Sequence, residues 1–473
     1  MSAAFFAGRA ARRSAINVTG DSDARDRLRN GEALWQQSST WRTAVEQLRM
    51  QTQCFRIIEL CGGLSTGYQA LNALLGTEKV ELVGLFEQDS DLRPALNIVH
   101  GSSSKVFLGT RGDVLSKASW TFPDAEILVA GPPCPPFSTI GTRAVFDDPR
   151  AAVFWKCIDI IADLGQRGSL LMFVLENVEG ITKKQHGCDE PPIKPLLRAL
   201  NTKLSSFQMD VLLLNTADFG LPHSRPRVYI VGRRIDAFPR GQPPGVEAFA
   251  DFVALKDILQ VSDNSGRRSY TELQKSNISD FKDLYSGMMN DVSRLGQFAV
   301  VDHSRTPTSR TKWSANRALK PDIVECLTAS GPALHVFSLG EGRHSDLSLD
   351  RPLFAFERGR LQGFPETLCK AAVSDSVAKR MFGNAMSVPV LGSVLAREIK
   401  ALVRSRQDSI IPTNMFNLMP AALHTRSSSS TDTVVDRSHG EASGSADDHC
   451  PVPGADLPPS QDDNIVAIHI HNC

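Results

Sequence analysis

The residue with the clearest chemical potential in this 473-residue chain is Cys134. It stands in the octapeptide GPPCPPFS, residues 131–138, directly after the apolar run 126–130. Such a run predicts a buried strand, and in open α/β sheets ligands and chemistry gather where strands end. Prolines fix φ and remove backbone donors, so the thiol has a defined direction. This context predicts a nucleophile, although the octapeptide alone also fits an ordinary small buried cysteine.

Two further segments place ionisable groups beside predicted strands. Glu176 follows the apolar run 173–175, where a carboxylate is costly to bury unless it is paired or protonated. Its pKa should therefore rise, which suits a general acid. Arg225 and Arg227 project the same way from an extended segment, as a clamp for an anion or a carbonyl requires. Taken singly, a strand-capping glutamate and a solvated basic edge are equally good interpretations.

A glycine turn and two acids indicate a nucleoside-like ligand. Residues 55–67 read FRIIELCGGLSTG, a strand and a turn, with a helix expected to begin near Leu64. Glycines let backbone N–H groups approach a ligand, but the spacing does not match the G-x-G-x-x-G fingerprint. Glu87 closes the next predicted strand, where an acid can bond a ribose diol, and Asp113 stands at a third expected strand end. In this order the residues outline a nucleoside pocket.

The elements that must position these groups alternate between strand and helix. This alternation predicts an α/β fold, with a mostly parallel, helix-covered sheet. The expected strands are 55–60, 80–86, 126–130, 170–175, 209–214 and 228–231. The expected divisions are an N-terminal extension that need not be ordered (1–52), a catalytic domain (53–234), a smaller domain (235–373), a C-terminal helix (374–404) and a disordered acidic tail rich in Ser and Pro (405–473).

Composition and charge exclude some classes of function. No stretch approaches the roughly 18 apolar residues of a membrane helix, so no membrane partner is expected. The nine cysteines contain no C-x-x-C pair, which disfavours a zinc site and a disulfide framework. Residues 421–473 hold eight acids and two arginines, and the whole chain has 52 basic and 52 acidic residues. Residues 1–420 therefore carry six excess positive charges, which suits a nucleic-acid partner.

In collinear order these segments resemble the cytosine-C5 DNA methyltransferases that use S-adenosylmethionine. The resemblance runs from Phe55 to about Arg404. It is carried by Glu59-Leu60 and Gly63, Glu87, Asp113, Pro133-Cys134, Glu176-Asn177-Val178, Arg225-x-Arg227, LQGFP at 361–365 and GNAMSVPV at 383–390. No single motif is decisive, but six or more in order leave little room for coincidence.

The resemblance implies a fold, a cofactor and a mechanism. The fold is a Rossmann-like methyltransferase sheet with residues 235–373 as the target-recognition domain. Cys134 would attack C6 of a flipped-out cytosine, and Glu176 would hydrogen-bond or protonate the N3 side. Arg225 and Arg227 would stabilise the base at O2 and raise the thiolate fraction of Cys134. The residues implied to bind S-adenosylmethionine are Glu59, Leu60, Cys61, Gly63, Leu64, Glu87, Asp113, Pro133 and Asn384.

Five positions depart from the family pattern. Cys61 stands where an aromatic residue is usual, and Ser65 and Thr66 stand where glycines are usual. His223 and Pro135 occupy positions where the family usually or often has glutamine. None of these changes removes a group that the chemistry requires. They bear on cofactor affinity more than on the type of reaction.

Double-stranded DNA is the expected partner, with no metal and a monomeric state, and two alternatives stay open. One is methylation of tRNA, but that branch typically has a Cys-Phe-Thr tripeptide, which is absent here. The other is an inactive nucleic-acid-binding regulator, against which the intact catalytic residues argue. The basic residues expected to contact phosphate are Arg233, Arg234, Arg240, Arg305, Arg310, Lys312, Arg317 and Lys320.

The sequence leaves the compartment open. Arg9, Arg12 and Arg13 precede the first acid, Asp21, as in an organellar transit peptide, although a frayed terminus fits equally well. A nuclear address is expected for a eukaryotic enzyme, and otherwise the cytoplasm or nucleoid.

Overall fold

The computed structural model describes most of the chain between Glu32 and Ile410. The described residues are 14–16, 32–51, 53–134, 148–184, 188–238, 243–260, 270–287, 297–304, 306, 320–331, 334–339, 349–371, 374–410 and 468–469. Residues 1–407 and 466–473 group into one compact unit, and residues 408–465 into a second. Among the described residues, no helix is long and apolar enough to cross a membrane.

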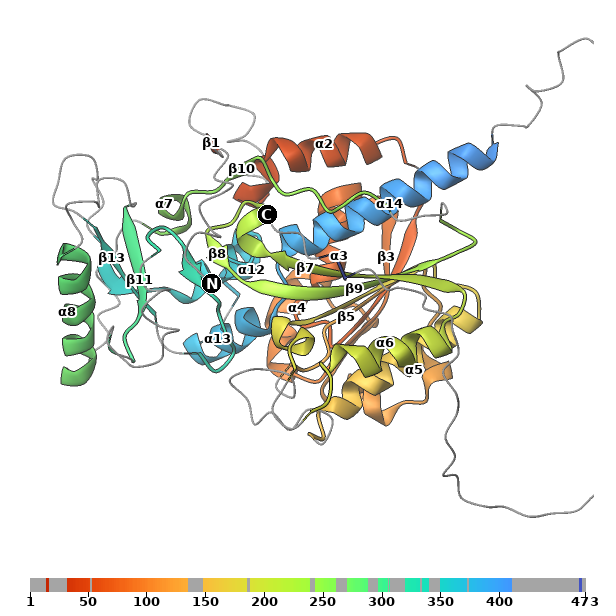
Figure 1. Cartoon of the computed structure of the whole chain (residues 1–473), viewed down its shortest axis with the longest axis horizontal. Helices are drawn as coiled ribbons and strands as arrows, with labels where there is room; N and C mark the ends of the chain where they lie inside the picture. Colours follow the sequence, from red (N-terminus) through yellow and green to blue (C-terminus); the bar gives the residue numbers. More distant parts are fainter. Residues whose placement is uncertain are drawn as a thin grey trace, which may run out of the picture. The chain divides into compact units, whose positions relative to one another are not determined.

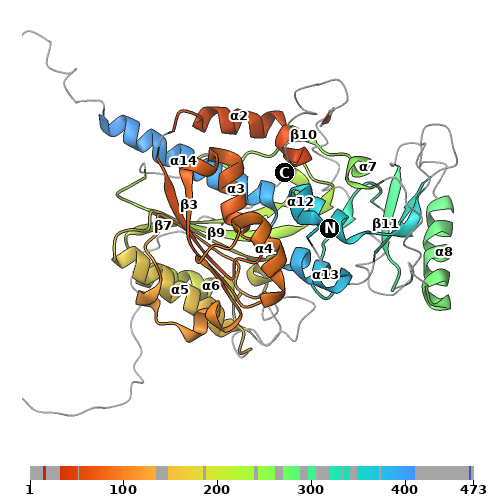
Figure 2. The same cartoon turned by 180° about the vertical axis from the view of Figure 1, so that it is seen from behind.

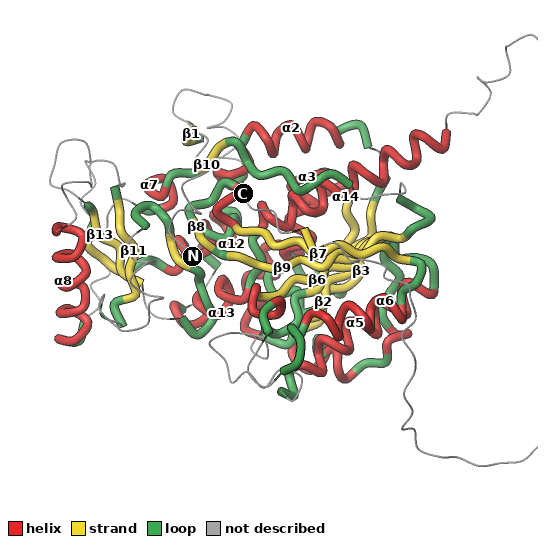
Figure 3. The backbone as a smooth tube through the Cα atoms, in the orientation of Figure 1, coloured by secondary structure: helices red, strands yellow, loops and turns green. Residues whose placement is uncertain are grey.

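A mostly parallel sheet organises the first unit (Figure 3). The strands lie in the order β15-β7-β9-β6-β5-β2-β3-β4. Their bounds are β2 Phe55–Leu60, β3 Val80–Glu87, β4 Val106–Leu108, β5 Ile127–Ala130, β6 Met172–Val178, β7 Phe207–Asn215, β9 Pro226–Arg234 and β15 Ile468–His469. Neighbouring strands run parallel, except that β9 is antiparallel to both β6 and β7. The first residues of β9 therefore lie at the same edge as the last residues of β6.

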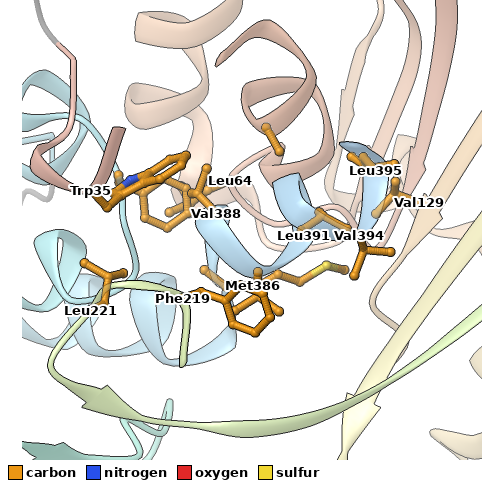
Figure 4. Packing of buried hydrophobic residues seen from close by; sticks show 14 of the residues in the cluster. Trp35, Leu64, Val129, Phe219, Leu221, Met386, Val388, Leu391, Val394 and Leu395 are labelled. Atoms are coloured by element: carbon orange, nitrogen blue, oxygen red, sulfur yellow. The ribbon is translucent and has the colours of Figure 1, made fainter. Parts of the chain in front are cut away.

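Helices cover both faces of the sheet (Figures 1 and 2), and the side chains of each strand alternate between the two faces. In β5, Ile127 and Val129 join one core, whereas Leu128 and Ala130 join the other, as the period of two in a strand requires. The first core contains side chains of α2 (Ser39–Leu48), α3 (Thr66–Leu75) and α14 (Val388–Ile410), with Val129 beside Val394 and Leu395 of α14 (Figure 4). The second contains α5 (Ala151–Gln166) and α6 (Ile193–Lys203).

A second sheet lies within the region predicted to be the smaller domain. Strands β11 (Phe298–Asp302), β13 (Leu334–Ser338) and β14 (Asp350–Pro352) are antiparallel, and Phe281 and Tyr285 of α8 (Glu272–Gly287) pack on them. The remaining helices are α4 Arg93–His100, α7 Leu255–Ile258, α11 Ala355–Arg360, α12 Glu366–Cys369 and α13 Asp375–Asn384. Two short parallel pairs are β1 (Ser14–Ala15) with β10 (Asp251–Phe252) and β8 (His223–Ser224) with β12 (Val324–Glu325).

All six predicted strands form, and several expected boundaries are wrong. The helix after the glycine turn begins at Thr66, close to the expected Leu64, whereas Asp113 follows a short turn rather than closing a strand. The C-terminal helical region is two helices, because residues 385–387 interrupt it. The helical structure also continues past 404 to Ile410, and β15 pairs with β7 inside the predicted disordered tail.

The N-terminal extension is ordered where it reaches the core, contrary to the expectation that residues 1–52 need no fixed structure. Trp35 and Trp41 are buried and meet edge to face, with ring centroids 4.8 Å apart. The Trp35 indole Nε1 donates a hydrogen bond of 2.8 Å to the Gly363 carbonyl. Two buried aromatic side chains therefore fasten this segment to the catalytic domain, an interaction that strand–helix alternation could not reveal.

Replacing Trp35 by alanine is expected to lower the free energy of unfolding by about 3–5 kcal/mol, because the change empties a buried aromatic site and leaves a carbonyl unpaired. Urea denaturation followed by circular dichroism measures this loss. Trp120→Ala is the matched control, since 74% of the Trp120 surface is exposed. The control should stay within about 0.5 kcal/mol of the parent. Equal losses in the two variants would contradict a structural role for the N-terminal segment.

One of the arginines expected at a nucleic-acid surface is buried instead. Arg233 Nη1 lies 2.8 Å from Asp210 Oδ2 and 3.4 Å from Glu398 Oε2, inside an ionic cluster that joins the sheet to α14. Its position in β9 decides this outcome, because alternate residues of a strand face the core. Arg234 pairs with Asp236, and Lys320 is exposed. Arg240, Arg305, Arg310, Lys312 and Arg317 lie outside the described residues.

Candidate active site

The predicted catalytic side chains meet at one edge of the sheet. Cys134 follows β5, and Glu176 lies near the end of the neighbouring parallel strand β6. Arg227 enters from the start of antiparallel β9, in register with Val178. The Asn177 side-chain amide donates a 3.1 Å hydrogen bond to the Pro132 carbonyl. This bond fixes the proline turn to β6 and holds the cysteine segment at the site.

Glu176 is buried, and burial raises the pKa of its carboxyl group above the usual value, as the sequence predicted. The nearby charges of Arg227 and Arg225 oppose this rise. Arg227 Nε lies 3.1 Å from Glu176 Oε1 and forms an ion pair with it. Within the described residues this oxygen has no well-aligned hydrogen-bond donor. Burial and incomplete pairing of this kind favour the protonated form of the carboxyl group, as a proton donor requires.

Cys134 is partly buried, and burial raises the pKa of its thiol. Arg227 and Arg225 act in the opposite direction, as predicted, and Glu176 adds to the rise. The two arginines therefore favour the thiolate, as expected. The net pKa of Cys134 is nevertheless raised, because burial outweighs their effect. In the protein without bound ligands, the thiol of Cys134 ionises less readily than an ordinary cysteine. Pro135 lies outside the described residues.

The expected clamp of two arginines is wrong in one respect, because the guanidinium of Arg225 is hydrogen-bonded to backbone carbonyls. Its guanidinium donates to the carbonyls of Leu327 at 2.6 Å, Gly383 at 3.0 Å and Ala385 at 2.8 Å. Arg225 is fully enclosed, and this burial lowers its pKa. It joins the start of β9 to the segments around Leu327 and Ala385, and of the two arginines it is Arg227 that forms the ion pair with Glu176.

Cys326 is a site residue that sequence reasoning missed. Its sulfur lies 3.6 Å from Arg227 Nη2 and 3.8 Å from Arg225 Nη1. The pairing of β12 with β8 brings it there across about 100 residues of sequence, and no local motif marks that pairing. His223 supports the same junction: Leu327 N–H donates to its Nε2 at 3.2 Å, while its Nδ1 lies 3.0 Å from the Leu361 carbonyl. The departure at His223 therefore has a structural role.

Glu59 organises the glycine turn rather than facing a ligand. Its buried carboxylate accepts hydrogen bonds from the Ser65 hydroxyl at 2.6 Å, Gly67 N at 3.0 Å and Tyr68 N at 2.9 Å. These are the first groups of α3, whose backbone donors need acceptors. Ser65 adopts a left-handed φ of 58°, which costs roughly 1–2 kcal/mol for a residue with a Cβ. Its hydroxyl bond to Glu59 compensates for the glycine that is usual there.

The other pocket residues surround the same turn. Glu87 Oε2 accepts from Gly63 N at 2.9 Å, and burial raises its pKa. Gly63 has a φ of 53°, and an added Cβ there would meet nothing within 4 Å, so its backbone borders open space. Asp113 caps a short helical turn by accepting from Leu115 N. The pKa of the Cys61 thiol is raised, first by its hydrogen bond with Cys157 and then by burial and nearby acids, which include Glu87 and Asp113.

The remaining predicted cofactor residues fall into two groups. Leu60 and Leu64 are core residues, so only their backbone is available to a ligand. Pro133 is partly exposed, and Asn384 is exposed where α13 ends. The side chain of Met386 packs against the backbone at Gly131, two residues before Pro133, since its Cε would lie 2.8 Å from a Cβ added at Gly131. The open backbone at Gly63, with the partly exposed acids Glu87 and Asp113 around the same turn, fits a nucleoside-bearing cofactor such as S-adenosylmethionine.

The Glu59 carboxyl group gives a testable pH dependence. Burial raises its pKa to about 7, above the ordinary 4.5. The folded state therefore binds more protons than the unfolded state between pH 4.5 and 7, and its contribution to stability falls as pH rises through that window. Glu59→Gln is expected to remove this slope, as measured by unfolding at a series of pH values. Glu81→Gln, at an exposed position on β3, should keep it; a parental slope in Glu59→Gln would contradict the assignment.

The fold and the site are those of an S-adenosylmethionine-dependent methyltransferase. Residues 55–401 match the model of the C-5 cytosine-specific DNA methylase family, and the chain belongs to this family. It is therefore a cytosine-C5 methyltransferase, an enzyme that takes its methyl group from S-adenosylmethionine. Among the described residues, no cluster of His, Cys, Asp and Glu could hold a metal ion.

Similar proteins include bacterial enzymes. The chain is 29% identical over 288 residues to the Type II methyltransferase M.HpaII of Haemophilus parainfluenzae, covering 56% of this chain and 69% of that protein. It is 26% identical over 359 residues to M.SsoII of Shigella sonnei, covering 74% and 81%. Among solved structures, the S. pombe Dnmt2 methyltransferase has a TM-score of 0.48 and 18% identity, covering 74% of this chain and 99% of its own.

Proposed function

We propose that this enzyme methylates C5 of cytosine in double-stranded DNA through a covalent intermediate on Cys134. One observation carries the proposal: Arg227 lies 3.1 Å from buried Glu176, and its charge acts on Cys134 at the same sheet edge. A thiol, a proton donor and a cation are thus grouped as nucleophilic addition to a pyrimidine requires. The description of the family supports DNA as the substrate.

The proposed cycle assigns each residue one task. The Cys134 thiolate forms a bond to C6 of a cytosine turned out of the duplex. Glu176 donates a proton or a hydrogen bond at N3, and Arg227 stabilises negative charge as it develops on the base at O2. C5 becomes electron-rich and would bond to the methyl carbon as the bond from that carbon to the sulfonium sulfur of the donor breaks, with its electron pair left on that sulfur. A base then removes the C5 proton, and the bond between sulfur and C6 breaks to release Cys134.

S-adenosylmethionine, when bound, supplies the electrophilic methyl group for this reaction. The glycine turn at Gly63, the acids Glu87 and Asp113, and Asn384 are the residues that would hold it. Glu87 would exchange one of its present backbone partners for a ligand hydroxyl. Glu59 and Ser65 would act indirectly, by fixing the conformation of the turn.

RNA is the second candidate substrate, and one observation favours keeping it in the test. The tripeptide at 326–328 is Cys-Leu-Thr, which differs from the Cys-Phe-Thr of the tRNA branch only in its middle residue. Cys326 also contacts Arg227 at the site. The absence of the exact tripeptide therefore weighs less against RNA, because a near match to it lies beside Arg227.

Trapping with a fluorinated base tests both the chemistry and the polymer. Duplex DNA and tRNA that contain 5-fluorocytosine are incubated separately with the full chain and S-adenosylmethionine. Fluorine at C5 cannot leave as a proton does, so the covalent protein adduct should persist on a denaturing gel. We expect an adduct with DNA. An adduct with tRNA alone would replace the substrate, and the lack of an adduct with either polymer would overturn the proposal.

A further inference from the structure

We propose that Cys326 is a site of reversible oxidation. A peroxide oxidises the sulfur of Cys326 before that of Cys134, and the oxidised sulfur then accepts hydrogen bonds from Arg227. The contacts of this sulfur carry the inference. Two guanidinium groups approach it, from Arg227 at 3.6 Å and Arg225 at 3.8 Å. Cationic surroundings favour a thiolate and thereby peroxide attack. The consequence for methyl transfer depends on the function proposed above, whereas the oxidation itself does not.

The backbone holds Cys326 in this position. The next residue, Leu327, is fixed on both sides, because its N–H donates to His223 Nε2 and its carbonyl accepts from Arg225 Nη1 at 2.6 Å. Residues 324–325 pair in register with residues 223–224. The backbone of Cys326 therefore cannot move away from the two arginines without breaking this junction. Cys326 is only partly buried as a residue, which gives a small oxidant a path toward it.

A separate observation shows an unmet hydrogen-bond donor in one of the two guanidinium groups at this sulfur. Arg225 is 2% exposed, and its Nε has no hydrogen-bond partner among the described residues. Unpaired buried donors are uncommon in proteins because each one forfeits a bond to water. An oxygen attached to the Cys326 sulfur would bring an acceptor to this group of donors. The site is thus suited to a sulfenate as well as to a thiolate.

The pKa values of the two thiols at the site, Cys326 and Cys134, shift in opposite directions. The two arginines lower the pKa of Cys326 even though burial acts against them. Burial dominates at Cys134 and raises its pKa. In the protein without nucleic acid, Cys326 is therefore the thiol with the larger ionised fraction, although Cys134 is the proposed nucleophile.

The oxidation step balances with hydrogen peroxide as the co-reactant. The Cys326 thiolate attacks one peroxide oxygen, an S–O bond forms, and the O–O bond breaks. Sulfur loses two electrons, and the hydroxide that leaves takes up a proton to become water. The sulfenate oxygen then accepts hydrogen bonds from Arg227, which competes with its ion pair to Glu176. A thiol reductant such as dithiothreitol returns the sulfur to its starting state.

Dimedone labelling tests the proposal on the full chain without cofactor or nucleic acid. The protein receives substoichiometric hydrogen peroxide and dimedone, and peptide mass spectrometry measures the label at each cysteine. Cys326 should carry about tenfold more label than Cys134 or Cys54. Arg227→Met should lower the label on Cys326, and Arg227→Lys, which keeps the charge, should retain most of it. Thermal unfolding of each variant verifies that it is folded.

Enzyme inactivation supplies the second readout. Peroxide should reduce methyl transfer by the parent enzyme, and dithiothreitol should restore it. Cys326→Ser, with activity expressed relative to its own untreated sample, should resist the treatment, whereas Cys54→Ser should remain as sensitive as the parent. First labelling at Cys134 or Cys54, or equal sensitivity of Cys326→Ser and the parent, would overturn the proposal. If the protein shows no methyl transfer, dimedone labelling by itself still tests whether Cys326 is oxidised first.

Discussion

Replacing Cys134 by alanine is expected to reduce methyl transfer by at least about 10⁴-fold, because the reaction then has no nucleophile to add to C6 of the base. The cytosine C5 carbon is a weak nucleophile until that addition has occurred. The variant should still bind S-adenosylmethionine, since the residues around Gly63 are untouched. The substitution should also leave the turn before residue 134 in place, because the Asn177–Pro132 hydrogen bond does not involve the thiol.

Transfer of a labelled methyl group to duplex DNA measures the effect. Cys54→Ala is the matched control, because Cys54 is exposed and lies before the first strand of the catalytic sheet. It should retain the parental rate and the 5-fluorocytosine adduct, and Cys134→Ala should lose both. Residual transfer by Cys134→Ala within tenfold of the parent would show that the reaction needs no covalent bond to this sulfur.

Glu176→Gln is expected to lower kcat by about 10²–10⁴-fold, the usual contribution of a positioned proton donor. The amide preserves the shape of the side chain and one hydrogen bond, but it has no acidic proton to transfer. It also removes the partner of Arg227, whose Nε lies 3.1 Å from the carboxylate. Glu179→Gln, three residues farther along in a surface ion pair with Lys183, is the matched control and should keep the parental kcat.

The pH profile separates a loss of proton donation from a loss of structure. The parent needs an ionised Cys134 and a protonated Glu176, both groups having raised pKa values in the free protein. Its kcat/KM should therefore pass through a maximum. Glu176→Gln should lose the limb that this carboxyl group contributes, and its rate should rise with pH until Cys134 is ionised. A bell-shaped profile in Glu176→Gln would exclude Glu176 as the proton donor.

These expectations depend on opposed electrostatic requirements at one site. Burial favours the neutral form of both the Cys134 thiol and the Glu176 carboxyl group. The neutral form is the one that the reaction needs at Glu176 but not at Cys134. Arg227 favours the charged form of both groups. If Arg227 moves toward a bound base, its charge stabilises the Glu176 carboxylate less, and the protonated form of Glu176 becomes more favourable. The same guanidinium also contacts Cys326, so one cation connects the proposed catalytic and oxidation chemistry.

The sequence by itself determined the sheet and most of the pocket outline. Strand–helix alternation located six strands because buried parallel strands are short apolar runs that local composition reveals. Parallel neighbours end at the same edge of a sheet, so the parallel pair β5 and β6 brought Cys134 and Glu176 together. The raised pKa of Glu176 also followed from local sequence, since a carboxyl group next to an apolar strand is desolvated wherever that strand is buried.

Only the tertiary structure decided which polar groups face the site and which hold the protein together. Arg225 and Arg227 are equivalent in the sequence, but three backbone carbonyls from distant segments engage Arg225 and leave Arg227 facing Glu176. Contacts of the same long-range kind fasten Trp35 and bring Cys326 to the arginines. Residue type and spacing fix local conformation and the face a side chain occupies, whereas its hydrogen-bond partners depend on segments that only folding brings close.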